Sequence, residues 1–341
     1  MQFFDYILAS ALPSKKDFKI LKKEGFLSLN YTKNPKPLKG LTQGFFDRLK
    51  KLNLNQLEKE YKKSKKYKVL RLDDKNYPKL LLEIADSPAY LFILGESNVL
   101  DKPALAFVGS RRATSYGKKV VFNLIYNLDF PWAIVSGLAM GIDSFSHQAA
   151  LEADKKTIAV LGSGFHHLYP AFNKRLAQNI IKSGGVIISE YPPHFEPEAF
   201  YFPARNRIIA GLSQATIVIE AAQKSGSLIT ASLAAKYGRD VLAVPNEVFA
   251  LTSVGCFSLI KQGAKPIFIA QDIEEDYGRL FPKFKNELET DPLGKFLQTP
   301  KHIDEIAKFL KASVNDAVSK ISILEMENKV KNLGAGFYQK I

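Results

Sequence analysis

The chain has 341 residues, of which 46% are hydrophobic and 24% are charged. This composition is typical of a folded globular protein and excludes a disordered or fibrous chain. The single cysteine, Cys256, excludes an internal disulfide and a cysteine-bound metal centre, so we expect a reducing, cytoplasmic environment. The apolar N-terminus contains Asp5 and no basic segment precedes it, which predicts a core helix and not a signal peptide. No apolar run approaches the roughly 18 residues of a membrane span, and we expect no contact with a membrane.

The formal net charge of +14 is concentrated near the N-terminus. Residues 1–80 hold 20 Lys or Arg against 8 Asp or Glu, whereas the other 261 residues hold 28 against 26. A basic face of this kind indicates a polyanionic partner. A solvated lysine-rich helix explains the same residues equally well, and charge alone does not decide between the two.

The first expected element is a basic, helical, SAM-like domain over residues 1–66, with breaks at Pro13, Gly25 and Gly40. The pattern changes at Tyr67. The segment "YKVLRL" predicts a strand, and the residues up to Gly95 predict a turn, a short helix and a second strand.

Strands and helices then alternate. Short apolar runs occupy 104–108, 132–135, 157–161, 186–188, 215–219 and 241–244. Helix-like segments lie between them at 117–128, 143–153, 173–182, 204–211 and 227–236. Strands that are apolar throughout, separated by helices, predict a sheet covered on both faces. We therefore expect an α/β fold over residues 67–272, a Rossmann-like doubly wound and mostly parallel sheet.

A charged, proline-containing stretch at 273–288 predicts a linker, and residues 289–341 predict three helices followed by a hairpin. This is the order of a winged-helix domain. Its third helix, about 313–329, carries Asp316, Glu325 and Glu327 beside Lys320 and Lys329. A helix that reads a DNA groove is more basic, so a protein contact or a structural role is favoured here.

Cationic and aromatic residues follow the expected strands, at the edge where parallel sheets bind ligands. They are Arg111, Arg112, Arg205, Arg207 and Lys224, with Phe200, Tyr201 and Phe202 beside Arg205. Arginines and backbone amides can hold phosphates, and aromatic faces can stack bases, as single-stranded nucleic acid requires. The alternatives are purely structural roles. Gly109 and Ser110 can form a tight turn and a helix cap, and the aromatic residues Phe200 to Phe202 can belong to the hydrophobic core.

Other candidates favour structural roles. Asp143 fits the N-cap of a helix as well as it fits a site residue. His147, four residues later on the same helix face, could pair with it. His166 and His167 lack a partner at metal-ligand spacing. Glu190 and Glu220 lack a third group that would complete an acid–base set. There is no P-loop, and the glycines around Gly162 do not form a dinucleotide fingerprint, so we expect no cofactor, no metal and no catalytic residue.

In this order the motifs resemble the DNA-processing protein A family (DprA, also called Smf). The most specific are "FVGSRRATSYG", "FPARNRIIAGLS" and "SGSLITA", and the similarity covers about residues 67–268. The resemblance implies a cytoplasmic protein that binds single-stranded DNA, protects incoming DNA and loads the RecA recombinase onto it during natural transformation. It also implies a homodimer formed through the Rossmann-like domain, and no chemical reaction.

The resemblance, applied motif by motif, implies a DNA pocket in this chain. In it, Arg111 binds a phosphate through two hydrogen bonds, and Gly109 lets that phosphate come close to the backbone. Its residues are Gly109, Ser110, Arg111, Arg112, Ser136, Gly137, Phe200, Phe202, Arg205, Asn206, Arg207, Lys224, Ser225, Gly226, Ser227 and Thr230. Two positions depart from the family pattern. Asn246 stands where a glycine is usual, and we expect it to keep the turn because Asn tolerates positive φ. Phe257 stands where an asparagine is usual.

Two alternatives remain open. Related Rossmann-like sheets include nucleoside monophosphate N-glycosidases, whose helix carries a glutamate that "KSGSLITASLA" lacks. A sensor that binds a small nucleotide without turnover is the other.

Overall fold

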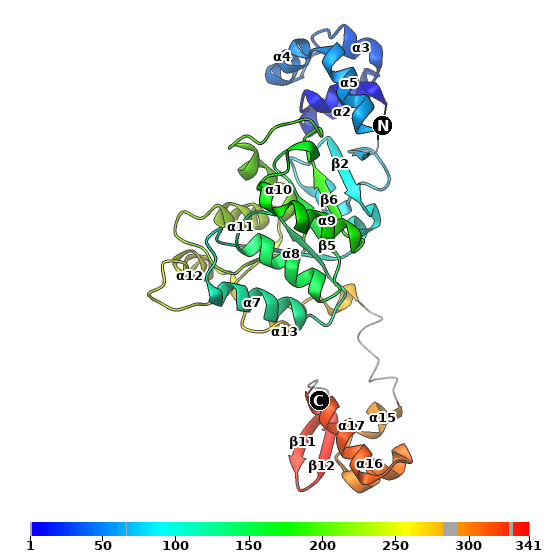
Figure 1. Cartoon of the computed structure of the whole chain (residues 1–341), viewed down its shortest axis with the longest axis vertical. Coiled ribbons are helices and arrows are strands. Elements are labelled where there is room, and N and C mark those ends of the chain that lie inside the picture. The colour runs from blue at the N-terminus through cyan, green and yellow to red at the C-terminus, as the bar shows by residue number, and fades with distance from the viewer. Residues whose placement is uncertain (1, 66, 282–291, 327–329, 341) are drawn as a thin grey trace. The chain divides into compact units, whose positions relative to one another are not determined.

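The computed structural model describes residues 2–65, 67–281, 292–326 and 330–340 (Figure 1). The chain forms two compact units, Met1–Glu274 and Glu275–Ile341. Among the described residues, no helix combines the length and the apolar character that crossing a membrane requires.

The first unit begins with the expected helices. They are α1 (Phe3–Ser10), α2 (Lys15–Lys23), α3 (Leu29–Lys33), α4 (Gln43–Lys51) and α5 (Leu54–Ser64). The Ser14 hydroxyl caps α2 by accepting from the Asp17 N–H at 3.1 Å. Tyr6, Phe18 and Phe45 are fully buried among these helices, which bury their apolar faces against one another and against the sheet.

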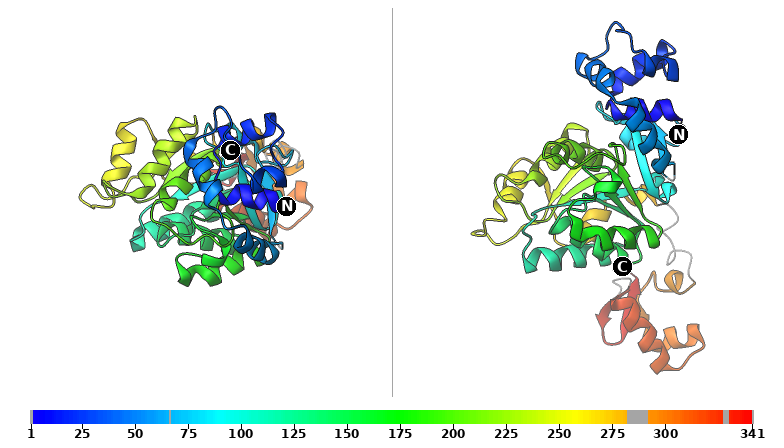
Figure 2. Two further views of the ribbon diagram at one scale, coloured as in Figure 1. Left: turned by 90° about the horizontal axis from the view of Figure 1, so that it is seen from above. Right: turned by 45° about the horizontal axis from the view of Figure 1, so that its top comes forward.

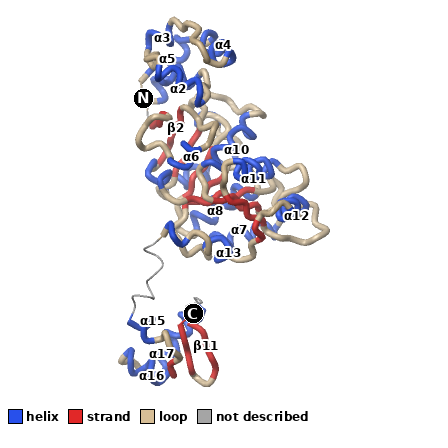
Figure 3. The backbone as a smooth tube through the Cα atoms, turned by 180° about the vertical axis from the view of Figure 1, so that it is seen from behind, coloured by secondary structure: helices blue, strands red, loops and turns tan. Residues whose placement is uncertain are grey.

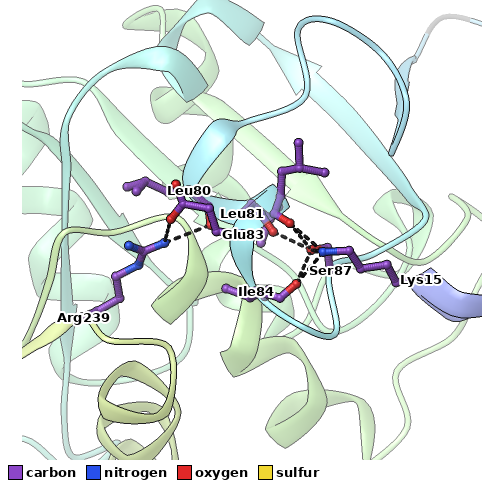
Figure 4. A network of polar contacts seen from close by, with 8 residues as sticks. Lys15, Leu80, Leu81, Glu83, Ile84, Ser87 and Arg239 are labelled. Carbon is purple, nitrogen blue, oxygen red and sulfur yellow. Dashed lines mark hydrogen bonds and ion pairs between the residues drawn. The ribbon is translucent and has the colours of Figure 1, made fainter.

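Polar contacts also join the N-terminal helices to the sheet. The Lys15 ammonium donates to the carbonyls of Leu82 and Ile84 at 2.6 and 2.7 Å (Figure 4). These carbonyls end helix α6 (Lys79–Glu83), which Arg239 contacts through the Leu80 carbonyl and the Glu83 carboxylate. The N-terminal helices and the sheet therefore pack as one unit across the expected boundary at residue 66.

The sheet has nine strands in the order β1-β2-β6-β5-β4-β3-β7-β8-β9. Their bounds are β1 Lys68–Arg71, β2 Tyr90–Gly95, β3 Ala104–Val108, β4 Ala133–Ser136, β5 Thr157–Val160, β6 Val186–Ser189, β7 Ala215–Val218, β8 Asp240–Ala243 and β9 Lys265–Pro266. Strands β3 to β9 pair in parallel, and β2 runs antiparallel to both β1 and β6. Every residue of β3 to β7 is buried. The predicted mostly parallel α/β fold is confirmed.

Helices cover both faces of the sheet (Figures 2 and 3). The helices α7 (Ser115–Tyr126), α8 (Ile142–Glu152) and α9 (Lys174–Lys182) pack on one another, as do α10 (Tyr201–Gly211) and α11 (Gly226–Lys236). Short 3-10 turns, η1 (Ser97–Asp101), η2 (Phe165–His167) and η3 (Ala171–Asn173), and helices α12 (Val254–Lys261) and α13 (Gln271–Glu274) complete the unit. The chain leaves β3 in one direction for β4 to β6 and returns on its other side at β7. The boundary between β3 and β7 is therefore the switch point at which such sheets bind ligands.

The second unit contains η4 (Gly278–Leu280), α15 (Pro292–Phe296), α16 (Ile303–Leu310), α17 (Val314–Met326) and strands β10 (Lys301–His302), β11 (Val330–Gly334) and β12 (Phe337–Lys340). Its sheet has the order β10-β12-β11. Three helices followed by a hairpin agree with the expected element order, and the winged-helix assignment itself stays a prediction. Residues 327–329 of the expected third helix and 282–288 of the expected linker lie outside the described residues. The first two residues of that linker, Ile273 and Glu274, are buried in α13 of the first unit.

Candidate nucleic-acid interface

A cavity of about 530 Å³ opens at the carboxyl ends of β3 and β7, at the switch point. We call it the strand-end pocket. Twelve of the predicted site residues line it: Gly109, Ser110, Arg111, Arg112, Phe202, Arg205, Asn206, Lys224, Ser225, Gly226, Ser227 and Thr230. Four do not: Ser136, Gly137, Phe200 and Arg207. Three segments that are distant in sequence therefore meet at one place.

Exposed cations surround the mouth of the strand-end pocket. Arg111, Arg112 and Lys224 are exposed, and within the described part of the chain none of them forms an ion pair. The Arg111 guanidinium lies 5.9 Å from the centroid of the Phe202 ring. A cation beside an aromatic face can hold a phosphate and a base together.

The N-terminus of α11 forms one wall of the pocket. The Ser225 hydroxyl caps this helix by accepting from the Ser227 N–H at 3.3 Å, and the two hydroxyls lie 2.7 Å apart. A Cβ placed on Gly226 would meet nothing within 4 Å, so this stretch of backbone is open to the pocket. The positive end of the helix dipole and the Gly226 N–H favour an anion at this wall.

Gly109 has a packing role at the end of β3 and also lines the strand-end pocket. A Cβ at this position would lie 2.6 Å from Ile142 Cγ1 and 3.0 Å from the Glu220 carbonyl oxygen. The glycine therefore lets the end of β3 pack against α8, and the expectation that it also lets a phosphate approach the backbone stays a prediction. The backbone at Gly226, where a Cβ would meet nothing within 4 Å, is also open to a ligand.

Arg205 forms the floor of the pocket and is only 4% exposed. Its guanidinium donates to the carbonyls of Gly137, at 2.7 Å, and Val160. A Cβ on Gly137 would collide with this guanidinium, which explains the glycine. Burial lowers the pKa of Arg205 to about 10. Because carbonyls already occupy part of the guanidinium, the phosphate-binding capacity lies with the exposed cations above it.

Asp143 lies beside Arg205 and accepts from the Gly137 N–H at 3.1 Å. Burial raises the pKa of Asp143, and the Arg205 charge opposes that rise. His147 does not pair with this carboxylate, contrary to one expectation. Its Nδ1 lies 2.7 Å from the Thr157 hydroxyl, and burial lowers the pKa of His147 to about 3. The histidine is therefore a neutral core residue at physiological pH.

The structure does not bring Arg207 into the strand-end pocket. Its Nη2 lies 2.5 Å from Glu190 Oε2, and both residues line a separate cavity of about 170 Å³ near Asp17. Phe200 is 66% exposed and also lies outside the pocket lining.

The two departures from the family pattern and the second candidate carboxylate have plain structural accounts. Asn246 is absent from the described residues with positive φ, so this turn does not need the left-handed conformation that motivated the expectation. Phe257 is half-buried on α12.

Glu220 accepts from the Thr114 N–H and hydroxyl at 2.9 and 2.6 Å, which fixes the start of α7. The described residues contain no cluster of His, Cys, Asp or Glu that could hold a metal ion.

Sequence reasoning missed several apolar and small lining residues, namely Val108, Ala139, Pro203, Ile209, Ala222 and Ile229. Helical spacing could have found two of them. Ile229 lies three residues after Gly226, on the same face of α11, and Ile209 lies four after Arg205 on α10.

A family model, DNA recombination-mediator protein A, matches residues 68–278. The DNA processing protein DprA of Streptococcus pneumoniae is 44% identical over 233 residues, which cover 68% of this chain and 81% of that protein. The DprA of Bacillus subtilis is 45% identical over 207 residues, covering 60% of this chain and 69% of the relative.

Solved structures agree. The structure of S. pneumoniae DprA has a TM-score of 0.71 at 37% identity and covers 81% of this chain and 98% of its own. DNA processing protein A from Helicobacter pylori, whose structure concerns a single-stranded DNA binding mode, has a TM-score of 0.57 at 33% identity and covers 63% and 98%. The chain belongs to the DNA recombination-mediator protein A family.

Proposed function

We propose that this protein binds single-stranded DNA at the strand-end pocket. One observation carries the proposal: the unpaired cations Arg111, Arg112 and Lys224 surround a pocket that also offers an open helix N-terminus and an aromatic ring. The single-stranded DNA binding mode of the H. pylori relative supports the same assignment.

In the bound state, the Gly226 amide and the Lys224 ammonium contact one phosphate. Arg111 contacts the neighbouring phosphate through two parallel hydrogen bonds. The Phe202 ring stacks a base, an interaction that contributes about 1–3 kcal/mol. Stacking on a side chain requires an unpaired base, so the site favours a single strand over a duplex. The pocket volume of about 530 Å³ is within the usual size of ligand sites.

Family membership supports a proposal for the cellular role. We propose that the protein works in the cytoplasm, protects incoming DNA during natural transformation and transfers the strand to the RecA recombinase. No chemical reaction is part of this role.

We also propose a homodimer formed through the Rossmann-like domain. Several large apolar side chains are exposed on and before α12, namely Val248, Phe249, Leu251 and Val254. Phe249 is 93% exposed. Such a group of apolar side chains on a surface typically marks a protein interface.

A nucleotide-hydrolysing enzyme is the alternative, and the carboxylates weigh against it. Glu190 pairs with Arg207, and Glu220 accepts from Thr114. The acidic residue that lines the pocket, Asp143, is buried and accepts backbone hydrogen bonds. None of the three is positioned as a free nucleophile or base.

The test is fluorescence anisotropy of labelled oligo-dT across a salt series, competed with duplex and with AMP. We expect binding that weakens steeply with salt and that duplex and AMP displace poorly. Arg111→Ala should weaken binding about tenfold or more, since hydrogen bonds to charged groups contribute about 1.5–3 kcal/mol. The matched control is Arg175→Ala, an exposed arginine on α9 outside the strand-end pocket.

Equal affinity of Arg111→Ala and the wild type would overturn the assignment. Displacement of the oligomer by AMP, or release of adenine from AMP, would favour the nucleotide sensor or the N-glycosidase instead.

A further inference from the structure

A second charged cavity, of about 380 Å³, lies within the N-terminal helices. We call it the N-terminal groove. It is lined by Thr32, Lys33, Asn34, Pro35, Lys36, Leu49, Lys50, Leu52 and Leu54. Three of these residues are lysines and none is acidic, so the groove is cationic.

The walls of the groove are held in place by the fold. Tyr31 is buried, and its hydroxyl donates to the Lys36 carbonyl at 2.9 Å, which fixes the loop after α3. The Thr32 hydroxyl donates to the Leu29 carbonyl at 2.9 Å. On the other side, Leu49 is buried in the core, and the Lys50 ammonium lies 4.4 Å from the Phe46 ring centroid.

Several other lysines of the N-terminal helices have acidic or carbonyl partners. On α5, Lys62 pairs with Glu58 at 3.0 Å and Lys63 pairs with Glu60 at 2.9 Å. These pairs fit the interpretation of a solvated, lysine-rich helix.

On α2, Lys22 pairs with Asp73 at 2.8 Å and Lys15 donates to carbonyls. In contrast, Lys33, Lys36 and Lys50 are exposed, and none forms an ion pair with any described residue. Three like charges gathered in one concave surface without counterions attract an anion.

We propose that the N-terminal groove binds the phosphates of single-stranded DNA beyond the nucleotides held at the strand-end pocket. The inference rests on the proposed function and adds a second contact region to it. No aromatic side chain lines the groove, so its contacts are ammonium–phosphate contacts that do not read bases. It extends the length of strand that one protein covers.

The experiment compares a short oligo-dT of about six nucleotides with a long one of about 30, because single-strand sites cover roughly 4–16 nucleotides each. The full chain carries Lys33→Glu, Lys36→Glu and Lys50→Glu together. The matched control carries Lys102→Glu, Lys182→Glu and Lys236→Glu. These three lysines are exposed, lie outside both cavities and change the net charge equally.

We expect the groove variant to bind the long oligomer at least tenfold more weakly than the control variant, and the short oligomer as tightly as the control. Each lost phosphate contact reduces the salt slope by about 0.7, so the slope for the long oligomer should fall by roughly 2. A variant with Gln at the same three positions neutralises the groove without reversing its charge. If the Glu variant folds poorly, the Gln variant takes its place in the comparison, and we expect the same loss of salt slope.

Two results overturn the inference while leaving the proposed function intact: long-oligomer binding equal to that of the control variant, or equal losses for short and long oligomers. Failure of the wild type to bind either oligomer, or normal short-oligomer binding by Arg111→Ala, would instead overturn the proposed function.

Discussion

The arginines of the two basic motifs have three different roles. Arg111 is exposed at the mouth of the strand-end pocket beside Phe202, and it forms no ion pair with the described residues. Arg205 is buried beneath the pocket with its guanidinium on carbonyls. Arg207 pairs with Glu190 in another cavity. Identical side chains only two residues apart thus differ in what they can offer a ligand.

Substitutions at two glycines should distinguish an effect on DNA affinity from an effect on the free energy of unfolding. Gly226→Ala should leave the free energy of unfolding unchanged or raise it by about 0.4–1 kcal/mol, since its Cβ meets nothing and Gly→Ala reduces the entropy of the unfolded chain. The same methyl group would enter the strand-end pocket, so oligo-dT affinity should fall several-fold. Urea unfolding and anisotropy on one preparation measure both quantities.

Gly109→Ala is the control for that pair of measurements. Its Cβ would meet Ile142 and Glu220, so we expect a loss of about 1–3 kcal/mol in unfolding free energy. Wild-type DNA affinity in Gly226→Ala would show that no phosphate approaches that backbone.

Helix α10 explains how neighbouring residues separate. Phe202, Arg205 and Asn206 are three and four residues apart, so they share one face of the helix, and all three line the strand-end pocket. Arg207 falls on another face, where Glu190 at the end of β6 meets it. The ion pair joins α10 to the segment after β6 and so positions the face of α10 that lines the strand-end pocket.

Arg207→Leu should therefore reduce stability with little effect on DNA affinity per folded molecule. Removing one partner of a buried ion pair costs about 3–5 kcal/mol, because the other charge stays buried. The double variant Arg207→Leu with Glu190→Leu should recover much of that loss. Chemical denaturation of the two variants and of Glu190→Leu gives the coupling energy, and anisotropy gives the affinity. A large affinity loss in the folded double variant would place Arg207 in the binding site after all.

At the scale of the whole molecule, we expect the exposed apolar residues before α12 to be covered by a second copy of the chain in the proposed dimer. Replacing Phe249 and Leu251 with Asp should convert a dimer of 38.1 kDa chains into a monomer. Both side chains are more than four-fifths exposed, so the change should not unfold the chain.

Light scattering across a concentration series measures the mass. Ile323→Asp, at an exposed apolar residue of the second unit, is the control and should leave the mass unchanged. A wild type that is monomeric at every concentration would refute the dimer.

The sequence by itself determined the elements, their order and the sign of the surface charge. Uniformly apolar runs such as 104–108 and 215–219 became β3 and β7 within a residue of their expected ends, because burial on both faces leaves this local signature. The sequence likewise predicted the helices between these strands, the mostly parallel sheet and the family. Each depends on periodicity or composition over a short window.

Only the tertiary structure decided which residues meet. Segments around Arg111, Phe202 and Lys224, more than 100 residues apart at the extremes, converge because β7 pairs with β3 and not with its sequence neighbour β6. Whether a lysine is paired, as Lys22 is with Asp73, or unpaired in a groove, like Lys33, depends equally on what packs beside it. Strand pairing and side-chain partners arise from long-range contacts that balance burial against desolvation, and no local pattern encodes that balance.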